Sequence, residues 1–162
     1  MDVVYIRDDL IAGWRAACEF VAAEKVYLGR VALPPFDPER NLPKRMIAED
    51  LPMYCLVDAG KVVGWADIVP VDIPECAHRG ILGIGLLPEA RGKGSGKRLL
   101  EAVCHHAQRV GIEKVELTVY SSNRAAIALF ERYGFRRIGI IQDYRRLDGV
   151  TYDGLMMEKS LT

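Results

Sequence analysis

The first third of the chain holds one short apolar run, one helical stripe and a proline-rich interruption. Apolar residues fill positions 3–6 and then recur at helical spacing between residues 10 and 21, which predicts a strand followed by a helix. Prolines break the pattern within 33–43, so we expect an irregular loop there and a short helix over 44–50.

The central part of the chain has the pattern of strands. Apolar runs over 53–57 and 62–69 flank a turn sequence at 58–61, which predicts a hairpin. A third run, 81–87, contains two glycines and ends at Pro88. Because proline cannot continue a strand ladder, we expect this strand to end there.

The last part alternates between helices and strands. A helical stripe ends at Gly111, and a strand is expected over 115–120. A second helix, capped by Ser122 or Asn123, is expected to run to about Tyr133. Two final strands are expected over two segments joined by an Asp-Gly bend, 135–141 and 152–157. The order β-α-α-β-β-β-α-β-α-β-β, without repeat or linker, predicts an α/β fold in one domain covering residues 1–162.

Composition narrows the classes of function. The 162 residues include 22 Lys and Arg against 22 Asp and Glu, so the formal net charge is zero, which argues against a general nucleic-acid or membrane binder. The four cysteines are widely spaced without a C-x-x-C pair, so we expect reduced thiols, no metal site and a cytoplasmic protein. The acidic start of the sequence has no apolar leader segment, and no stretch is long enough to span a membrane.

Charge is divided unevenly along the chain. Residues 1–80 carry 9 basic and 13 acidic side chains, net −4, whereas residues 81–162 carry 13 and 9, net +4. The second half also contains a glycine-rich basic loop, Arg91-Gly92-Lys93-Gly94-Ser95-Gly96, between a strand and a helix. The N–H groups and dipole at a helix N-terminus attract phosphates, and glycines let the backbone approach them closely. We therefore expect an anionic ligand at this loop.

Two standard nucleotide motifs do not fit the loop. A Walker motif requires glycine five positions before Gly96 and Ser or Thr after Lys97, but those positions hold Arg91 and Arg98. A dinucleotide fingerprint that starts at Gly92 requires glycine or alanine at Lys97 and a β-α-β unit, which the strand order does not provide.

The loop instead matches the pattern R-x-x-G-x-G, and with a second block it resembles the GNAT superfamily of N-acetyltransferases over nearly the whole chain. The second block, residues 123–135, is similar to the family segment N-x-x-A-x-x-L-[YF]-E-x-x-G-F. The resemblance implies a mixed, mostly antiparallel sheet flanked by helices, and acetyl-CoA as cosubstrate. It also implies the residues that hold the pantetheine and pyrophosphate: Leu86, Leu87, Arg91, Gly92, Lys93, Gly94, Ser95, Gly96, Lys97, Asn123 and Phe130.

The resemblance leaves the catalytic residues open. Many relatives use a glutamate early in the fourth strand as the base, but residues 76–81 contain no acid. His78, whose ordinary pKa suits proton transfer, and Glu75 are the nearest candidates, and Asp67 is a weaker one. The family's usual general acid, a tyrosine, is replaced by Phe130. Tyr133 is the next candidate on the same helix; otherwise the thiolate leaves unaided or water protonates it.

The tail, residues 148–157, is similar to a D-G-x-x-x-D-x-x-x-M ending found in the branch that acetylates free amino acids and small amines. A small primary amine is therefore the expected acceptor. A protein or peptide acceptor, bound near the 33–43 loop, is an alternative, and so is an acyl-CoA sensor without efficient catalysis, which Phe130 and the missing glutamate favour. Relatives often dimerise through the last strands, so a homodimer is expected.

Overall fold

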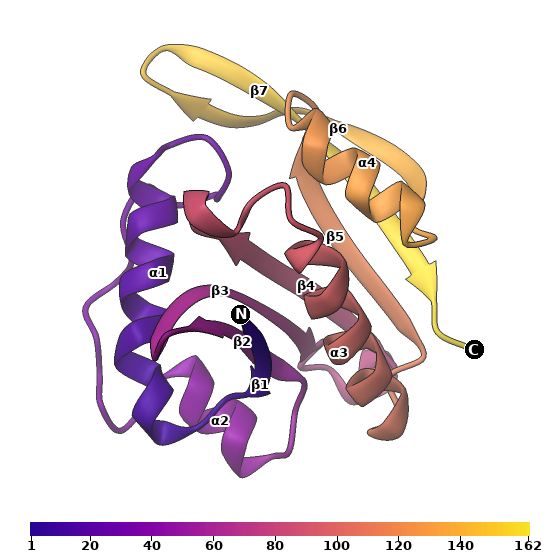
Figure 1. The fold of residues 1–162 in the computed structure, drawn as a ribbon. Coiled ribbons are helices and arrows are strands. Elements are labelled where there is room, and N and C mark those ends of the chain that lie inside the picture. Colours follow the sequence, from indigo (N-terminus) through magenta and orange to yellow (C-terminus); the bar gives the residue numbers. More distant parts are fainter.

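The structure, a computed structural model, describes all residues from 1 to 162. Seven strands form one sheet (Figure 1): β1 (Asp2–Tyr5), β2 (Met53–Asp58), β3 (Lys61–Pro70), β4 (Arg79–Leu86), β5 (Lys114–Tyr120), β6 (Arg136–Leu147) and β7 (Val150–Ser160). The helices are α1 (Ile11–Ala23), α2 (Leu42–Ala48), α3 (Ser95–Arg109) and α4 (Arg124–Arg132), with short 3-10 helices η1 (Asp8–Leu10), η2 (Pro74–Cys76) and η3 (Pro88–Ala90).

The strands are arranged in the order β1-β2-β3-β4-β5-β7-β6. Every neighbouring pair is antiparallel except β4 and β5, which are parallel. The predicted α/β fold with a mixed, mostly antiparallel sheet flanked by helices is therefore confirmed.

Helices α1 and α3 pack on opposite faces of the sheet. Burial, and after it the nearby carboxyl group of Asp67 in β3, raises the pKa of Cys18 in α1, so these two residues lie on the same face. On the other face, His106 of α3 hydrogen-bonds Tyr54 of β2, which pairs with Ala66 of β3. Because successive strand residues point to opposite faces, Ala66 and Asp67 define the α3 side and the α1 side of the sheet.

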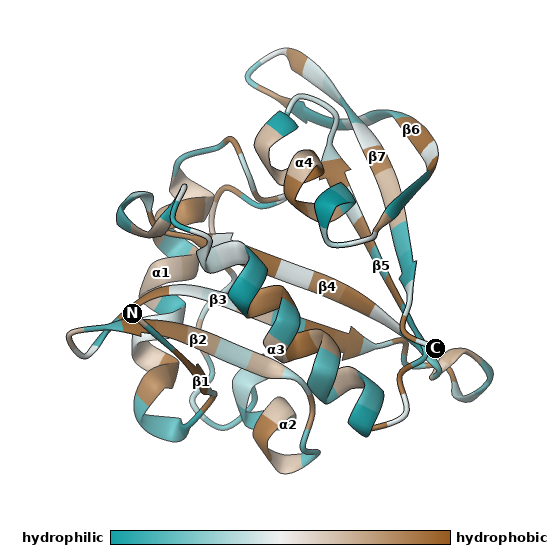
Figure 2. Ribbon diagram, turned by 45° about the vertical axis from the view of Figure 1, so that its right-hand side comes forward, coloured by the Kyte–Doolittle hydropathy of each residue, from teal (hydrophilic) through white to brown (hydrophobic).

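The strands β4 and β5 pair only at their beginnings. Residues 79–81 of β4 are in register with residues 114–116 of β5, and no pairing continues beyond them. Figure 2 shows the two strands close together near the C-terminus of the chain and apart beside α4. This splay opens the sheet along the second half of β4, directly before the glycine-rich loop.

The final hairpin is longer than the sequence pattern predicts. β6 extends to Leu147, well past the expected end at residue 141, and its register with β7 shifts between Ile141 and Arg145. Asp143 has φ of +53° at this irregularity, and its N–H donates to the Asp153 carboxylate at 3.0 Å. Directly after the bulge, Tyr144 and Arg145 lie against the ring of Tyr120 in β5.

None of the helices is both long and apolar enough to cross a membrane.

Candidate active site

A cleft of about 560 Å³ lies in the splay between β4 and β5. Its walls come from the end of α1 and the segment that follows it, from residues 82–86 of β4, from the glycine-rich loop, from residues 117–119 of β5 and from α4. The volume is in the ordinary range for small-molecule sites. Most of the residues that the sequence analysis assigned to cosubstrate binding line it: Leu86, Arg91, Gly92, Gly94, Ser95, Gly96, Lys97, Asn123 and Phe130.

The glycine-rich loop presents a row of free donors to this cleft. None of the backbone N–H groups from Gly92 to Lys97 donates a hydrogen bond within the chain. Helix α3 begins at Ser95, so the last three of these groups are the unpaired donors of a helix N-terminus. Six free donors and the positive end of the helix dipole together form a site for a phosphate-containing anion.

The glycines of the loop have different roles. Gly92 and Gly94 have φ of +69° and +77°, and a Cβ on either residue would meet no atom within 4 Å. Their conformation favours glycine, and the space beside them is open to a ligand. Gly96 instead allows α3 to approach α4, because a Cβ there would lie 2.7 Å from Cδ2 of Leu129.

Charged side chains of the loop are held in different ways. The guanidinium of Arg91 donates to both carboxylate oxygens of Glu24, at 3.0 and 2.6 Å, and to the carbonyl of Leu86 at 3.0 Å. It also lies over the Tyr27 ring, 4.5 Å from the centroid. Arg91 therefore connects the loop to the end of α1 and to the end of β4. Lys97 is exposed, with its Nζ 3.6 Å from Oε1 of Glu101, and Lys93 within the loop is exposed as well.

The backbone of β4 offers further polar groups to the cleft. In an antiparallel pair only alternate residues direct N–H and C=O toward the partner strand. Leu87 donates its N–H to the carbonyl of Val63 at 2.8 Å, so its donor is used by β3 and its side chain is buried. By the same alternation Ile84 and Leu86 direct their backbone groups away from β3, into the splay.

Helix α4 contributes one polar and one apolar residue. The Asn123 side-chain oxygen accepts from the N–H of Ala126 at 3.2 Å and caps the helix, which leaves its amide NH₂ for a ligand. Phe130 is buried and packs against Phe135, with ring centroids 5.7 Å apart and the ring planes tilted by 60°. At Phe130, where the family pattern has tyrosine, the cleft therefore has no hydroxyl.

The structure does not bring His78 or Glu75 to the cleft. Glu75 is exposed in η2, and His78 is exposed directly before β4, at the closed end of the splay. The His78 carbonyl accepts from the N–H groups of Glu113 and Lys114, at 2.8 and 3.2 Å, and so joins the starts of β4 and β5.

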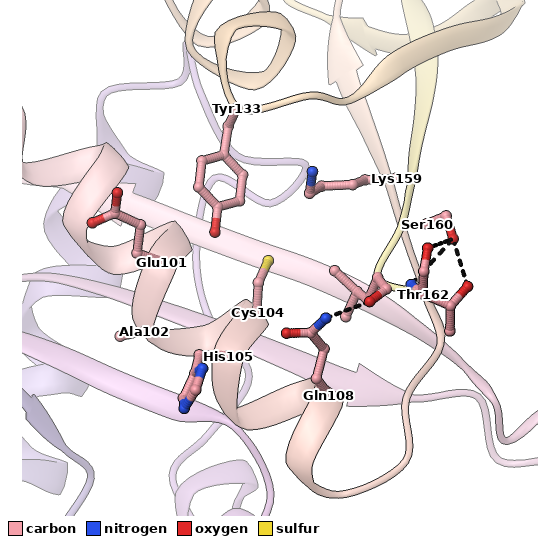
Figure 3. A pocket seen from close by; sticks show the side chains of 10 residues that line it. Glu101, Ala102, Cys104, His105, Gln108, Tyr133, Lys159, Ser160 and Thr162 are labelled. Atoms are coloured by element: carbon pink, nitrogen blue, oxygen red, sulfur yellow. Dashed lines mark hydrogen bonds between the residues drawn. The ribbon is translucent and has the colours of Figure 1, made fainter.

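Tyr133 also lies outside the cleft. It follows the last turn of α4 and lines a separate pocket of about 680 Å³, where its hydroxyl points toward Cys104 and its ring lies beside Lys159 (Figure 3). The Lys159 Nζ is 5.2 Å from the ring centroid. Burial raises the pKa of Tyr133 to about 12 and that of Cys104 to about 11. These groups therefore stay protonated at neutral pH, and α4 and α3 separate them from the cleft.

An aromatic and basic cluster lies next to the cleft on the α1 side. The Tyr120 hydroxyl donates to the carbonyl of Leu28, a residue of the cleft wall, at 3.0 Å. The rings of Tyr144 and Tyr152 lie 6.0 and 5.9 Å from that of Tyr120, and the Arg145 guanidinium lies 5.0 Å above it. One terminal nitrogen of Arg145 is buried without a hydrogen-bond partner. This cluster could not be predicted from the sequence pattern, because its residues lie on three strands and meet only through the pairing of those strands and the bulge in β6.

A buried acid, Asp67, lies beneath the β4 wall of the cleft. Its side chain is 7% exposed, and burial raises its pKa from the ordinary value to about 7. The sequence analysis treated it as a weak candidate, because the pattern of β3 does not reveal what covers each face of the strand.

The arrangement matches a known family. The model of the acetyltransferase (GNAT) family matches residues 10–135. Among curated proteins, the chain is 27% identical over 116 residues to the putative phosphinothricin acetyltransferase YwnH of Bacillus subtilis, covering 70% of this chain and 71% of that protein. It is 36% identical over 90 residues to the N-alpha-acetyltransferase RimI of Mycobacterium tuberculosis, covering 56% of this chain and 55% of that protein.

Other relatives match over a shorter part of their length. The chain is 38% identical over 80 residues, 48% of its own length, to the mycothiol acetyltransferase of Paenarthrobacter aurescens, of which it spans 25%. Among solved structures, the putative acetyltransferase yncA from Salmonella typhimurium with acetyl-CoA has a TM-score of 0.90 at 18% identity, covering 100% of this chain and 94% of that one. The match of the family model to most of the chain shows that this protein belongs to the GNAT family of acetyltransferases.

Proposed function

We propose that the protein transfers the acetyl group of acetyl-CoA to the primary amine of a small molecule. The observation that carries this proposal is the row of six free N–H groups from Gly92 to Lys97, beside two glycines whose missing side chains leave open space. A diphosphate satisfies such a row of donors. The backbone groups of Ile84 and the N–H of Leu86, which point away from β3, continue from it along the cleft, where the amide-containing arm of CoA hydrogen-bonds as a strand does.

The cleft favours a direct transfer. The bound thioester supplies an activated acetyl group, and backbone donors aimed at its oxygen stabilise the charge that grows there. No cysteine lines the cleft, and burial raises the pKa of the three buried thiols, so none of them is a thiolate nucleophile: Cys18, Cys55 and Cys104. The acceptor amine itself is therefore the nucleophile. Since Phe130 has no proton to give, the CoA thiolate leaves unaided or takes a proton from water.

The acceptor is an amine that also carries a negatively charged group, such as an amino acid or a related metabolite. The half-buried guanidinium of Arg145 supports this class, because a buried donor without a partner binds a carboxylate favourably. Tyr120, Tyr144 and Tyr152 surround Arg145 with aromatic surface. YwnH, a relative over most of the chain, is named for phosphinothricin, which agrees with a small acceptor.

The test is acetyl transfer by the purified protein, with separate pools of amino acids, polyamines, aminoglycosides and N-terminal peptides offered as acceptors. Products are counted by mass, because the four cysteines react with thiol dyes. Acetylation within the amino-acid pool supports the proposal. Acetylation of peptides only identifies a protein acceptor. Tight binding of acetyl-CoA without transfer to any pool identifies a sensor.

A further inference from the structure

We infer that Asp67 is the base that removes the proton from the acceptor's ammonium group, directly or through one water molecule. This inference rests on the proposed function and supplies the group that the cleft otherwise lacks. Neither His78 nor Glu75 lines the cleft, and Tyr133 lines the separate pocket.

The geometry places the Asp67 carboxyl group against the wall of the cleft. Asp67 of β3 and Gly83 of β4 are cross-strand partners whose side-chain positions share the α1 face of the sheet. A Cβ on residue 83 would lie 3.0 and 3.1 Å from the two carboxylate oxygens of Asp67. Gly83 lines the cleft, so the carboxyl group of Asp67 lies directly against a residue of the cleft wall, in the space that a side chain at residue 83 would fill.

The surroundings of Asp67 do not stabilise its ionised carboxylate. Burial alone accounts for its raised pKa, without any hydrogen-bond donor or positive charge in compensation. Two titratable groups face it, Cys18 from α1 and Cys55 from β2. Both are thiols whose own pKa is raised by burial, so both are uncharged at neutral pH. A buried, uncompensated carboxylate costs stability, and such groups are concentrated at functional sites.

The proposed reaction needs only the acceptor, acetyl-CoA, Asp67 and water. The ammonium of the acceptor gives one proton to the Asp67 carboxylate, which becomes a neutral carboxylic acid. The freed amine then forms the bond to the acetyl carbonyl carbon, the carbon–sulfur bond breaks, and its electron pair leaves with CoA as thiolate. The nitrogen passes its second proton to that thiolate through water, which leaves a neutral amide and CoA thiol, and Asp67 then returns its own proton to solvent. A base is most effective when its pKa lies near the working pH, and the Asp67 pKa of about 7 meets that condition.

The test compares wild type with Asp67→Asn, which keeps the shape of the side chain and removes the base. We expect kcat at pH 7 to fall about 100-fold, a usual contribution of general-base catalysis. We also expect the limb with an apparent pKa near 7 to disappear from the kcat profile, while the Kd for acetyl-CoA stays within about twofold, because Asp67 does not lie at the diphosphate end. Asp2→Asn, at an exposed position of β1, is the matched control.

Stability separates a catalytic role from a structural one. Raising the folded-state pKa of an acid makes the fold less stable as pH rises from the unfolded-state pKa toward the folded-state one, so above pH 7 the ionised Asp67 costs stability. Asp67→Asn should therefore have a Tm at pH 8 equal to or above that of wild type. A second variant, Asp67→Ala, leaves a space for formate. Added formate should raise the kcat of Asp67→Ala at least about threefold and should leave the kcat of Asp67→Asn unchanged.

Three results would overturn the role of Asp67 as the base. A folded Asp67→Asn protein with unchanged kcat and pH profile overturns the role of Asp67. A lower Tm or a weaker affinity for acetyl-CoA in both variants, without rescue by formate, shows that Asp67 is a structural residue. That result also overturns its role as the base. Failure of the wild type itself to acetylate any pool overturns the proposed function, and the role of Asp67 with it.

Discussion

The guanidinium of Arg91 joins both carboxylate oxygens of Glu24, at 3.0 and 2.6 Å, while its Nε donates to the Leu86 carbonyl. Glu24 directly follows α1, and Leu86 is the last residue of β4, so one side chain ties three elements together at the mouth of the cleft. The side chains of the pair are 29% and 24% exposed, which makes the interaction better shielded than a surface ion pair.

Glu24→Gln should weaken acetyl-CoA binding by about tenfold and lower the free energy of unfolding by about 1 to 3 kcal/mol, because it leaves a partly buried guanidinium without its charge partner. Titration calorimetry and urea unfolding measure the two effects. Glu89→Gln is the control, since Glu89 lies in η3 beside the same loop but forms an exposed ion pair with Lys61. Equal affinities in the two variants would remove Arg91 from the support of the loop.

Gly94→Val should weaken acetyl-CoA binding at least tenfold, about 1.4 kcal/mol, because its side chain enters the space proposed for the diphosphate. Gly111→Val is a matched control. Gly94 and Gly111 have φ of +77° and +87°, and a Cβ at either position meets no atom within 4 Å, but only Gly94 lines the cleft. Both variants should lose similar stability, and only Gly94→Val should lose affinity. An unchanged Kd in folded Gly94→Val would contradict the assignment of the loop.

Phe130→Tyr should keep or raise kcat, because it introduces a hydroxyl at a cleft position where the family pattern has tyrosine. Tyr133→Phe should leave kcat unchanged and lower the Tm by a few degrees, since the Tyr133 hydroxyl points into the separate pocket toward Cys104. Steady-state kinetics at saturating acetyl-CoA compares the two variants. A large loss of kcat in Tyr133→Phe alone would return Tyr133 to the mechanism as the general acid.

Arg145→Gln should raise the KM for a carboxylate-bearing acceptor at least tenfold without changing the Kd for acetyl-CoA, because it removes the guanidinium beside Tyr120 whose Nη2 has no partner. Arg146→Gln controls for net charge, since Arg146 is exposed on the same strand. The comparison should include the decarboxylated analogue of the preferred acceptor. If wild type and Arg145→Gln discriminate equally between acid and analogue, Arg145 does not contact the acceptor.

Most of the elements could be predicted from local pattern. The apolar runs and capping residues predict the helices to within a few residues, as at α4, where Asn123 caps and Gly134 with φ of +97° ends the helix. The end of β6 could not be predicted in this way. Residues 142–147 are mostly polar, and they continue the strand because pairing with β7 satisfies their backbone, not because they bury side chains.

The cosubstrate loop is visible in the sequence, because glycine spacing and basic charge are local signals. The catalytic groups are not local. Tyr133 follows Phe130 by three residues, but three steps along a helix rotate the side chain by about 60°, and at the end of α4 this places Tyr133 in the separate pocket. Asp67 and Gly83 lie on different strands, and only their pairing puts the carboxyl group behind the cleft wall.

The central claim is that acetyl-CoA binds in the splay between β4 and β5 with its diphosphate on the loop. Hydrogen exchange measured by mass spectrometry tests it directly, because the N–H groups of residues 92–97 have no partner within the chain and should exchange fast in the free protein. Saturating acetyl-CoA should slow exchange in peptides covering 82–98 and leave the peptide covering 159–162, beside the separate pocket, unchanged. Binding of acetyl-CoA without protection of residues 92–97 would contradict the account.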